Sequence, residues 1–97
     1  MSEYSTMLAR DLGLPHLDLE AESVPDGARS LFPKTYWIEK RAAPVRLDDS
    51  NLRLVMVDPL DIATIKAVAQ ASGRYIEVAV GDLLEIRALV DRSFSEE

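Results

Sequence analysis

The chain has 97 residues, of which 47% are apolar and 29% are charged. This composition is typical of a single globular domain rather than of a disordered segment. Eleven basic and 17 acidic side chains give a formal charge of −6. Because DNA and anionic membranes are bound largely through Lys and Arg, that balance argues against both as general partners. The absence of cysteine excludes disulfides and thiolate metal sites.

The hydropathy of the chain bears on where the protein resides. The first ten residues are polar and charged and lack the apolar core of a signal peptide. The longest uninterrupted apolar run covers residues 54–57, far short of the ~20 residues that cross a bilayer. We therefore expect a soluble, cytoplasmic protein without membrane insertion of its own.

The first part of the chain is predicted to be helical, with one short strand. Apolar residues at helical spacing predict a helix over 2–12, which Gly13 ends as a C-cap. Leu14 is expected to be extended, because the residue before a proline avoids the α region. The alternation over 16–19 that follows indicates a short edge strand.

Ser23 is the predicted N-cap of the next helix, with Pro25 near its first turn. Pro33 breaks or restarts this helix, and residues 34–40 continue as a second helical segment. The apolar side of the first helical stretch consists of Ala28, Leu31 and Phe32.

The second half of the chain alternates strands and helices. Residues 43–47 and 52–57 are predicted strands, and the turn formers at 48–51 join them into a β-hairpin. Asp58 is the predicted N-cap of the helix that follows, with Pro59 at its first position.

This helix ends at Ser72-Gly73, and a strand follows over residues 75–80. Asp82 and Glu85 have the spacing of a capping box for the last helix. The predicted buried stripes are Ile62, Ile65, Val68 and Ala69 in the earlier helix, and Leu83, Ile86, Val90 and Phe94 in the last.

The predicted fold class is therefore α/β (α+β), as one domain over residues 1–97. Residues 1–40 supply a helical segment with a short strand, and residues 41–97 form a ββαβα core. The hairpin and the parallel strand of the βαβ unit give a small mixed sheet, and the helices cover it.

Few residues offer catalytic chemistry. The four glycines stand far apart and no GxxxxGK[S/T] loop occurs, so nucleotide hydrolysis is not expected. His16, the one histidine, is interpreted as a surface or edge-strand side chain rather than a zinc ligand or triad member. The acidic pairs Asp48-Asp49 and Asp58/Asp61 fit a turn and a helix cap better than a cation site. We expect no enzyme, no cofactor and no metal.

The arginines are one candidate binding group. If the strands bring them together, they form either a solvated sheet face, which is the favoured interpretation, or an anion site. The residues concerned are Arg41, Arg46, Arg53 and Arg74.

The stretch from Phe32 to Arg41 is the other candidate. Together with Leu31, it holds more large apolar side chains than one face of a short, proline-broken helix can bury. We therefore predict a partner-binding surface there, in which Arg41 pairs with a carboxylate of the partner. For Trp37, a core anchor is the other interpretation, and it is the favoured one for a lone tryptophan in a small domain. The predicted partner-binding residues are Phe32, Tyr36, Trp37 and Arg41.

Several motifs stand in a defined order: Leu12-Gly13-Leu14-Pro15, Leu17-Asp18-Leu19, Leu31-Phe32-Pro33, Arg41, Pro44-Val45, the stretch 52–61, Ser72-Gly73, the strand 75–80 and the final Ile86, Val90 and Phe94. In order and spacing they resemble the N-terminal domain of type II secretion and type IV pilus assembly ATPases, in particular the C-terminal portion of that domain. The resemblance covers about nine tenths of the chain.

The resemblance implies a non-catalytic protein-interaction module that docks a hexameric motor to the inner-membrane platform. The partner would be the cytoplasmic domain of the L-type platform protein or its pilus equivalent, and the ATPase domain if the chain is part of a longer one. The protein would then be cytoplasmic, and peripheral at the inner membrane through its partner.

The resemblance also suggests an alternative function. Some relatives bind cyclic di-GMP through RLGxxL-type motifs, which this chain lacks. A sensor of cyclic di-GMP or another small ligand, held by the arginines of the hairpin, is therefore the second functional hypothesis.

Overall fold

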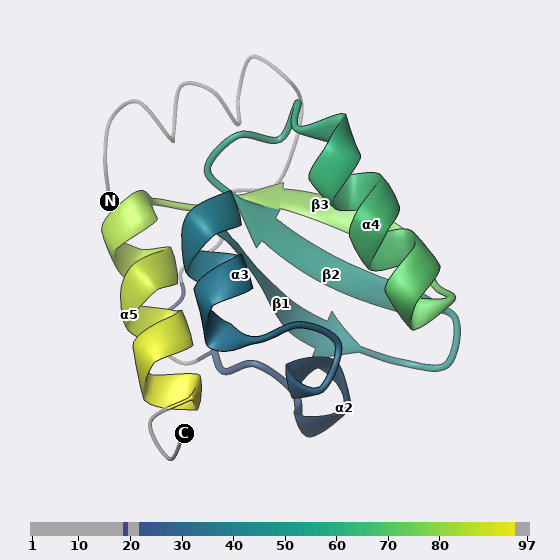
Figure 1. The fold of residues 1–97 in the computed structure, drawn as a ribbon, viewed down its shortest axis with the longest axis horizontal. Helices are drawn as coiled ribbons and strands as arrows, with labels where there is room; N and C mark the ends of the chain where they lie inside the picture. The colour runs from purple at the N-terminus through teal and green to yellow at the C-terminus, as the bar shows by residue number, and fades with distance from the viewer. Residues whose placement is uncertain (1–18, 20–21, 95–97) are drawn as a thin grey trace.

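The computed structural model describes Leu19 and residues 22–94. The helix predicted over 2–12 and the strand predicted over 16–19 lie outside these residues, apart from Leu19. The elements are α2 (Asp26–Arg29), α3 (Lys34–Lys40), β1 (Ala42–Leu47), β2 (Asn51–Met56), α4 (Ile62–Ser72), β3 (Tyr75–Val80) and α5 (Leu83–Ser93) (Figure 1).

The strands form the predicted mixed sheet, in the order β1-β2-β3. β1 and β2 pair antiparallel, and β2 and β3 pair parallel with Asn51 opposite Tyr75. The hairpin turn is held by Asp48, whose Oδ1 accepts from the backbone N–H of Ser50 (3.0 Å) and Asn51 (2.8 Å). These two hydrogen bonds lower the pKa of Asp48. The α+β fold class is confirmed.

The helices cover the sheet as Figure 1 shows, with α3 and α4 crossing one face and α5 lying beside α3. α4 contacts β3, and α2, α3 and α5 all contact β1. The large side chains that this arrangement buries almost completely are Leu19, Trp37, Leu52, Leu54, Val55, Met56, Val68, Val80, Ile86, Leu89, Val90 and Phe94.

The start of α4 differs from the prediction. Its N-cap is Asp61 and not Asp58, because Thr64 donates its backbone N–H (3.3 Å) and its hydroxyl (2.7 Å) to the Asp61 carboxylate. Asp58 instead accepts from the backbone N–H of Leu60 (3.0 Å) in the preceding turn, and Pro59 lies in that turn. Both aspartates are able to cap, and Asp61 does so because Thr64, three residues after it, donates both hydrogen bonds.

The later helix start moves the buried face of α4. Ile62, predicted to be buried, is 54% exposed, whereas the unpredicted Thr64 is buried with its hydroxyl satisfied by Asp61. Val68 is buried as predicted, and Ile65 packs against the core. The C-cap is as predicted, with Gly73 in the left-handed region.

The remaining helix predictions are confirmed in part. Asp82 caps α5 and accepts from the backbone N–H of Leu84 (3.0 Å), but Leu83 is exposed and Leu89 takes its place in the buried stripe. Ser23 does not cap α2; Pro25 holds that position, and the helix ends at Arg29. Since α2 is so short, the predicted apolar side beyond Ala28 lies outside it.

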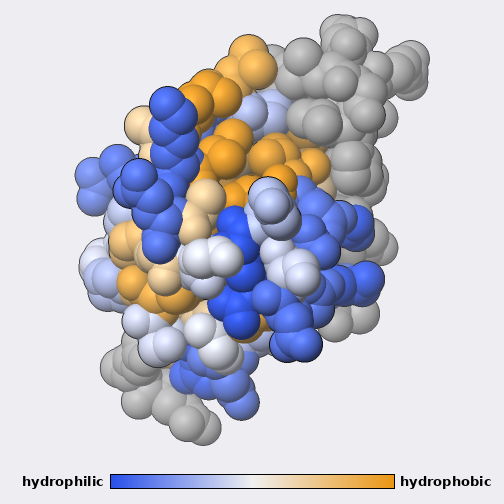
Figure 2. Space-filling model, turned by 90° about the vertical axis from the view of Figure 1, so that its right-hand side faces the viewer, coloured by the Kyte–Doolittle hydropathy of each residue, from blue (hydrophilic) through white to orange (hydrophobic). Residues whose placement is uncertain are grey.

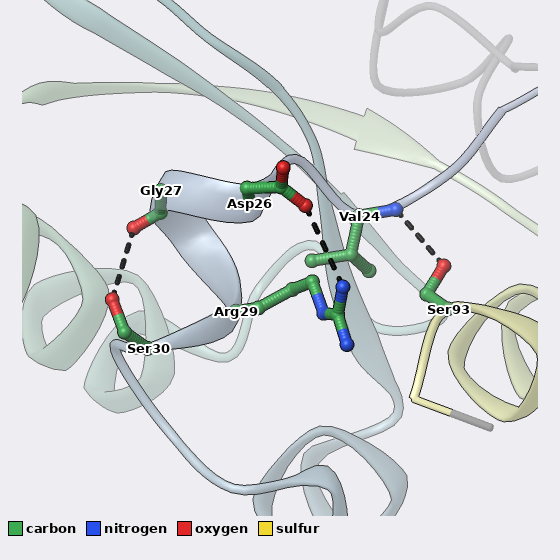
Figure 3. Close-up of polar contacts among 6 residues, drawn as sticks. All are labelled: Val24, Asp26, Gly27, Arg29, Ser30 and Ser93. Carbon is green, nitrogen blue, oxygen red and sulfur yellow. Dashed lines mark hydrogen bonds and ion pairs between the residues drawn. The ribbon is translucent and has the colours of Figure 1, made fainter. Parts of the chain in front are cut away.

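The segment before α3 is fastened to the end of α5 by polar contacts. The backbone N–H of Val24 donates to Ser93 Oγ (3.0 Å), as Figure 3 shows, and Arg92 donates to the carbonyls of Leu19 and Glu22. Arg29 lies 5.6 Å from the ring centre of Phe94. These contacts fix where the chain enters α3.

Candidate functional site

Three aromatic side chains cluster where α3 begins. The rings of Phe32 and Tyr36 stack with centroids 4.0 Å apart and an interplanar angle of 13°. Trp37 meets both rings edge-on, at 5.5 Å from Phe32 and 5.3 Å from Tyr36. Such offset and edge-on arrangements are the favourable geometries for aromatic pairs.

Burial divides this cluster. Trp37 has no exposed surface, so its alternative interpretation as a core anchor is the one that the structure supports. Phe32 and Tyr36 are half-buried and pack against the core with the remaining side exposed. Accessible aromatic surface is therefore present in the predicted region, on these two side chains.

Arg41 lies at the C-cap of α3 in the left-handed region, with φ 55° and ψ 49°. It is the one non-glycine residue with positive φ in the part of the chain that the structure describes. Its carbonyl accepts from the backbone N–H of Val57 (3.1 Å), which ties the end of α3 to the edge of the sheet. Its side chain is exposed.

A surface hollow of about 240 Å³ lies between α3 and α4. We call it the α3–α4 hollow. Its apolar lining comes from small residues of α4 and from one aromatic ring, and its polar lining from three side chains that the sequence analysis did not group. The lining residues are Tyr36, Lys40, Asp61, Ala63, Thr64 and Ala67.

The charges around the α3–α4 hollow are coupled. The hydroxyl of Thr64 lowers the pKa of Asp61, and the nearby cation of Lys40 lowers it further. Burial raises the pKa of Tyr36, and the Asp61 carboxylate adds to that effect. Lys40 Nζ also lies 5.9 Å from the ring centre of Tyr36. The hollow thus presents a neutral phenol beside one ionised carboxylate and one ammonium group.

The four arginines proposed as a patch do not gather at one place. Arg46 and Arg53 are register partners on β1 and β2, but Arg53 pairs with Glu77 (3.2 Å). Arg74 donates to the carbonyls of Asp48 and Ser72. Arg41 precedes β1, at the opposite end of the hairpin from its turn.

Other chemistry is not evident in the described ranges. Within Leu19 and 22–94, no group of three or more His, Asp or Glu side chains is placed to hold a metal ion. No helix in the same residues is long and apolar enough to cross a membrane. The described residues of this region offer apolar and charged contact surface.

Comparison with known proteins identifies the family. The profile of the MshEN domain matches residues 12–97. The chain belongs to the MshEN domain family. A search of curated proteins found no match.

Two solved structures resemble this MshEN domain over most of its length. The N-terminal domain of XpsE matches with a TM-score of 0.83 and 27% identity, over 95% of this chain and 65% of that one. MshE, solved with cdg, matches with a TM-score of 0.79 and 26% identity, over 97% and 70%. This chain therefore spans about two thirds of those structures. The resemblance to N-terminal domains of secretion and pilus ATPases is confirmed, and a regulatory or interaction domain is supported.

Proposed function

We propose that this MshEN domain docks a secretion or pilus assembly ATPase to the cytoplasmic domain of an inner-membrane platform protein. The observation that carries the proposal is the surface at α3, where Phe32 and Tyr36 are half-exposed around the start of the helix and Arg41 is exposed at its C-terminal end. Aromatic and arginine side chains are those most enriched at interface hot spots. On this proposal the domain is cytoplasmic and reaches the membrane through its partner.

Burial supports three of the four predicted residues as the proposed contacts with the partner. Phe32, Tyr36 and Arg41 supply accessible surface, whereas Trp37 supports their placement from beneath. Replacement of the buried Trp37 is expected to destabilise the fold and therefore does not test binding. The α4 helix contributes the opposite wall through the α3–α4 hollow.

The test is a titration of purified platform-protein cytoplasmic domains, from type II secretion and pilus systems, into the full 97-residue chain. Tyr36→Ala and Phe32→Ala should weaken binding at least tenfold, since one well-buried aromatic side chain contributes about 1.5–3 kcal/mol. Thr35→Ala, an exposed position of the same helix, is the matched control. If no platform domain binds the parent chain, the docking function is wrong.

Cyclic di-GMP sensing is the second candidate, because the related MshE structure was solved with cdg. Arg46 lies opposite Arg53 on the sheet, and because Arg53 pairs with Glu77, Arg46 is the cation of this pair that is proposed to meet a phosphate. Calorimetry with cyclic di-GMP, in the presence and absence of the platform domain, tests this candidate. Binding that Arg46→Ala abolishes would favour it over simple docking.

A further inference from the structure

Two adjacent cations at the end of α3 form no close ion pair. Lys40 and Arg41 are exposed, and neither side chain forms an ion pair or hydrogen bond with a residue that the structure describes. Most of the other basic side chains that the structure describes have carboxylate or carbonyl partners, namely Arg29, Lys34, Arg53, Arg74, Arg87 and Arg92. The Asp61 carboxylate, whose pKa Thr64 and Lys40 both lower, partly compensates Lys40, so Arg41 is the cation at this end of α3 that has no acidic partner among the described residues.

The backbone of Arg41 strengthens this observation. Glycine adopts the left-handed conformation without steric cost, whereas a residue with a Cβ atom is strained there. The carbonyl of Arg41 accepts from Val57 N–H, a contact that glycine would make equally well. No contact among the described residues accounts for the arginine side chain, and strained positions of this kind often serve binding.

The α3–α4 hollow lies directly beside these cations, since Lys40 forms part of its lining. Its volume of about 240 Å³ is below the roughly 300–1,000 Å³ of pockets for drug-sized ligands. Ala63, Ala67 and the ring of Tyr36 offer apolar walls of the size that one side chain of a partner can fill. The hollow therefore suits an anchoring side chain rather than a free metabolite.

We propose that the α3–α4 hollow and the Lys40-Arg41 pair together bind an acidic, apolar segment of the partner protein. A partner carboxylate pairs with Arg41, whose planar guanidinium can donate two parallel hydrogen bonds to it, and a neighbouring aliphatic side chain enters the hollow. This inference rests on the proposed docking function and adds the chemistry of the segment that is recognised.

The charges of the site orient such a segment. Asp61 lies in the hollow and is held ionised by Thr64, so it repels a carboxylate there and favours an uncharged side chain. Lys40 already interacts with the Asp61 carboxylate and the Tyr36 ring. Arg41 is therefore the main cation for the partner. The net charge of −6 disfavours polyanions, but one carboxylate at contact distance lies within the Debye length of about 8 Å, where the local cations dominate.

A peptide titration tests the chemistry directly. The probes are a ten-residue synthetic peptide with one leucine flanked by glutamates, and the same peptide with lysines in place of the glutamates. In NMR spectra of the ¹⁵N-labelled chain, the acidic peptide should shift amide signals of residues 36–41 and 61–67, and the basic peptide should not. Shifts with neither peptide, with both equally, or with the basic one alone would overturn the proposal.

Matched variants then locate the contacts. Arg41→Glu and Ala63→Leu should each weaken binding of the acidic peptide and of the platform domain at least tenfold, and Arg41→Lys should lose less than Arg41→Glu. The controls are Arg46→Glu, an exposed arginine near the other end of β1, and Ala71→Leu, an exposed alanine of α4 outside the hollow. Circular dichroism checks the fold of each variant. Equal losses in the controls would refute the placement.

The outcomes also separate this inference from the docking function. If the platform domain binds and Arg41→Glu and Ala63→Leu bind it like the parent, docking stands and the inference is wrong. If the acidic peptide binds at the hollow but no platform domain binds, the docking function is wrong and the chemistry of the site stands.

Discussion

The two neighbouring helices α3 and α5 use their side chains in opposite ways. α5 buries the regular stripe Ile86, Leu89 and Val90. Its last residues, Arg92 and Ser93, form hydrogen bonds with the segment before α3. α3 buries Trp37 alone and leaves two aromatic rings half exposed at one end and two cations exposed at the other. A helix with a regular apolar period uses its apolar side chains in the core. A short helix between Pro33 and a strained C-cap keeps side chains exposed, and these are able to contact a partner.

The hydropathy of the surface around α4 adds to this contrast. Figure 2 shows apolar side chains gathered over part of the face that includes α4, beside charged ones. Among the described residues with large exposed apolar side chains, Leu60 and Ile62 stand at the start of α4. Leu83 and Leu84 at the start of α5 are exposed as well, so both helices leave apolar surface near their first turn.

The largest effect that sharpens this comparison is expected from the two adjacent aromatics of α3. Trp37→Ala should lower the free energy of unfolding by about 3–5 kcal/mol, because a fully buried ring leaves a cavity. Tyr36→Ala should cost clearly less, since its ring is half exposed. Urea denaturation followed by circular dichroism measures both. Equal losses would place Tyr36 in the core and remove it from the proposed interface.

A second prediction concerns the close approach on the α5 side. An added Cβ at Gly81 would lie 2.6 Å from Val55 Cγ2 and 3.2 Å from Ile86 Cδ1. Gly81→Ala should therefore lower the free energy of unfolding by about 1–3 kcal/mol through overpacking.

The double variant with Val55→Ala is the control for this prediction. It should recover part of the loss relative to the sum of the two single changes, because the clashing methyl group is gone. Strict additivity in thermal or urea unfolding would show that the clash is not the cause.

The cap of α4 gives the third prediction. Asp61→Ala should cost about 0.5–2 kcal/mol, and Asp58→Ala less, because Asp61 accepts the capping hydrogen bonds from Thr64. Asp82→Ala, which removes the cap of α5, is the matched comparison. A larger loss for Asp58→Ala in urea denaturation would contradict the assigned cap.

The same cap predicts a pH dependence. The pKa of Asp61 is lowered in the folded state, so its stabilisation is present above the unfolded pKa of about 4 and is lost as the pH falls through the folded value. Asp61→Asn keeps a capping oxygen but cannot titrate. Its stability should therefore fall less than that of the parent between pH 5 and the folded pKa, and parallel curves would count against this role.

The smallest effect, and one of opposite sign, is expected at Arg41. Arg41→Gly should raise the free energy of unfolding by ~0.5 kcal/mol, since relief of left-handed strain exceeds the entropy gained by the unfolded chain. The same variant should weaken partner binding, which would separate strain from function. Arg41→Asn, which tolerates this conformation, is the control. A folded Arg41→Gly variant that is less stable than the parent would refute the strain.

The sequence by itself determined the elements whose signals are local. Alternation and turn formers predicted the hairpin, the glycine at 73 marked the end of α4, and Asp82 marked the start of α5. The mixed sheet followed from the βαβ order, because a strand reached through a helix returns parallel. The excess of apolar residues around Pro33 also led to the prediction of a partner-binding surface there, and that surface stays a prediction.

Only the tertiary structure decided how these elements divide their surfaces. Trp37 and Tyr36 are neighbours of similar chemistry, and the packing of α3 against β1 and α5 buries one and exposes part of the other. The α3–α4 hollow combines residues from two helices separated by the whole hairpin. No local pattern specifies such a juxtaposition, because it depends on where the sheet places each helix.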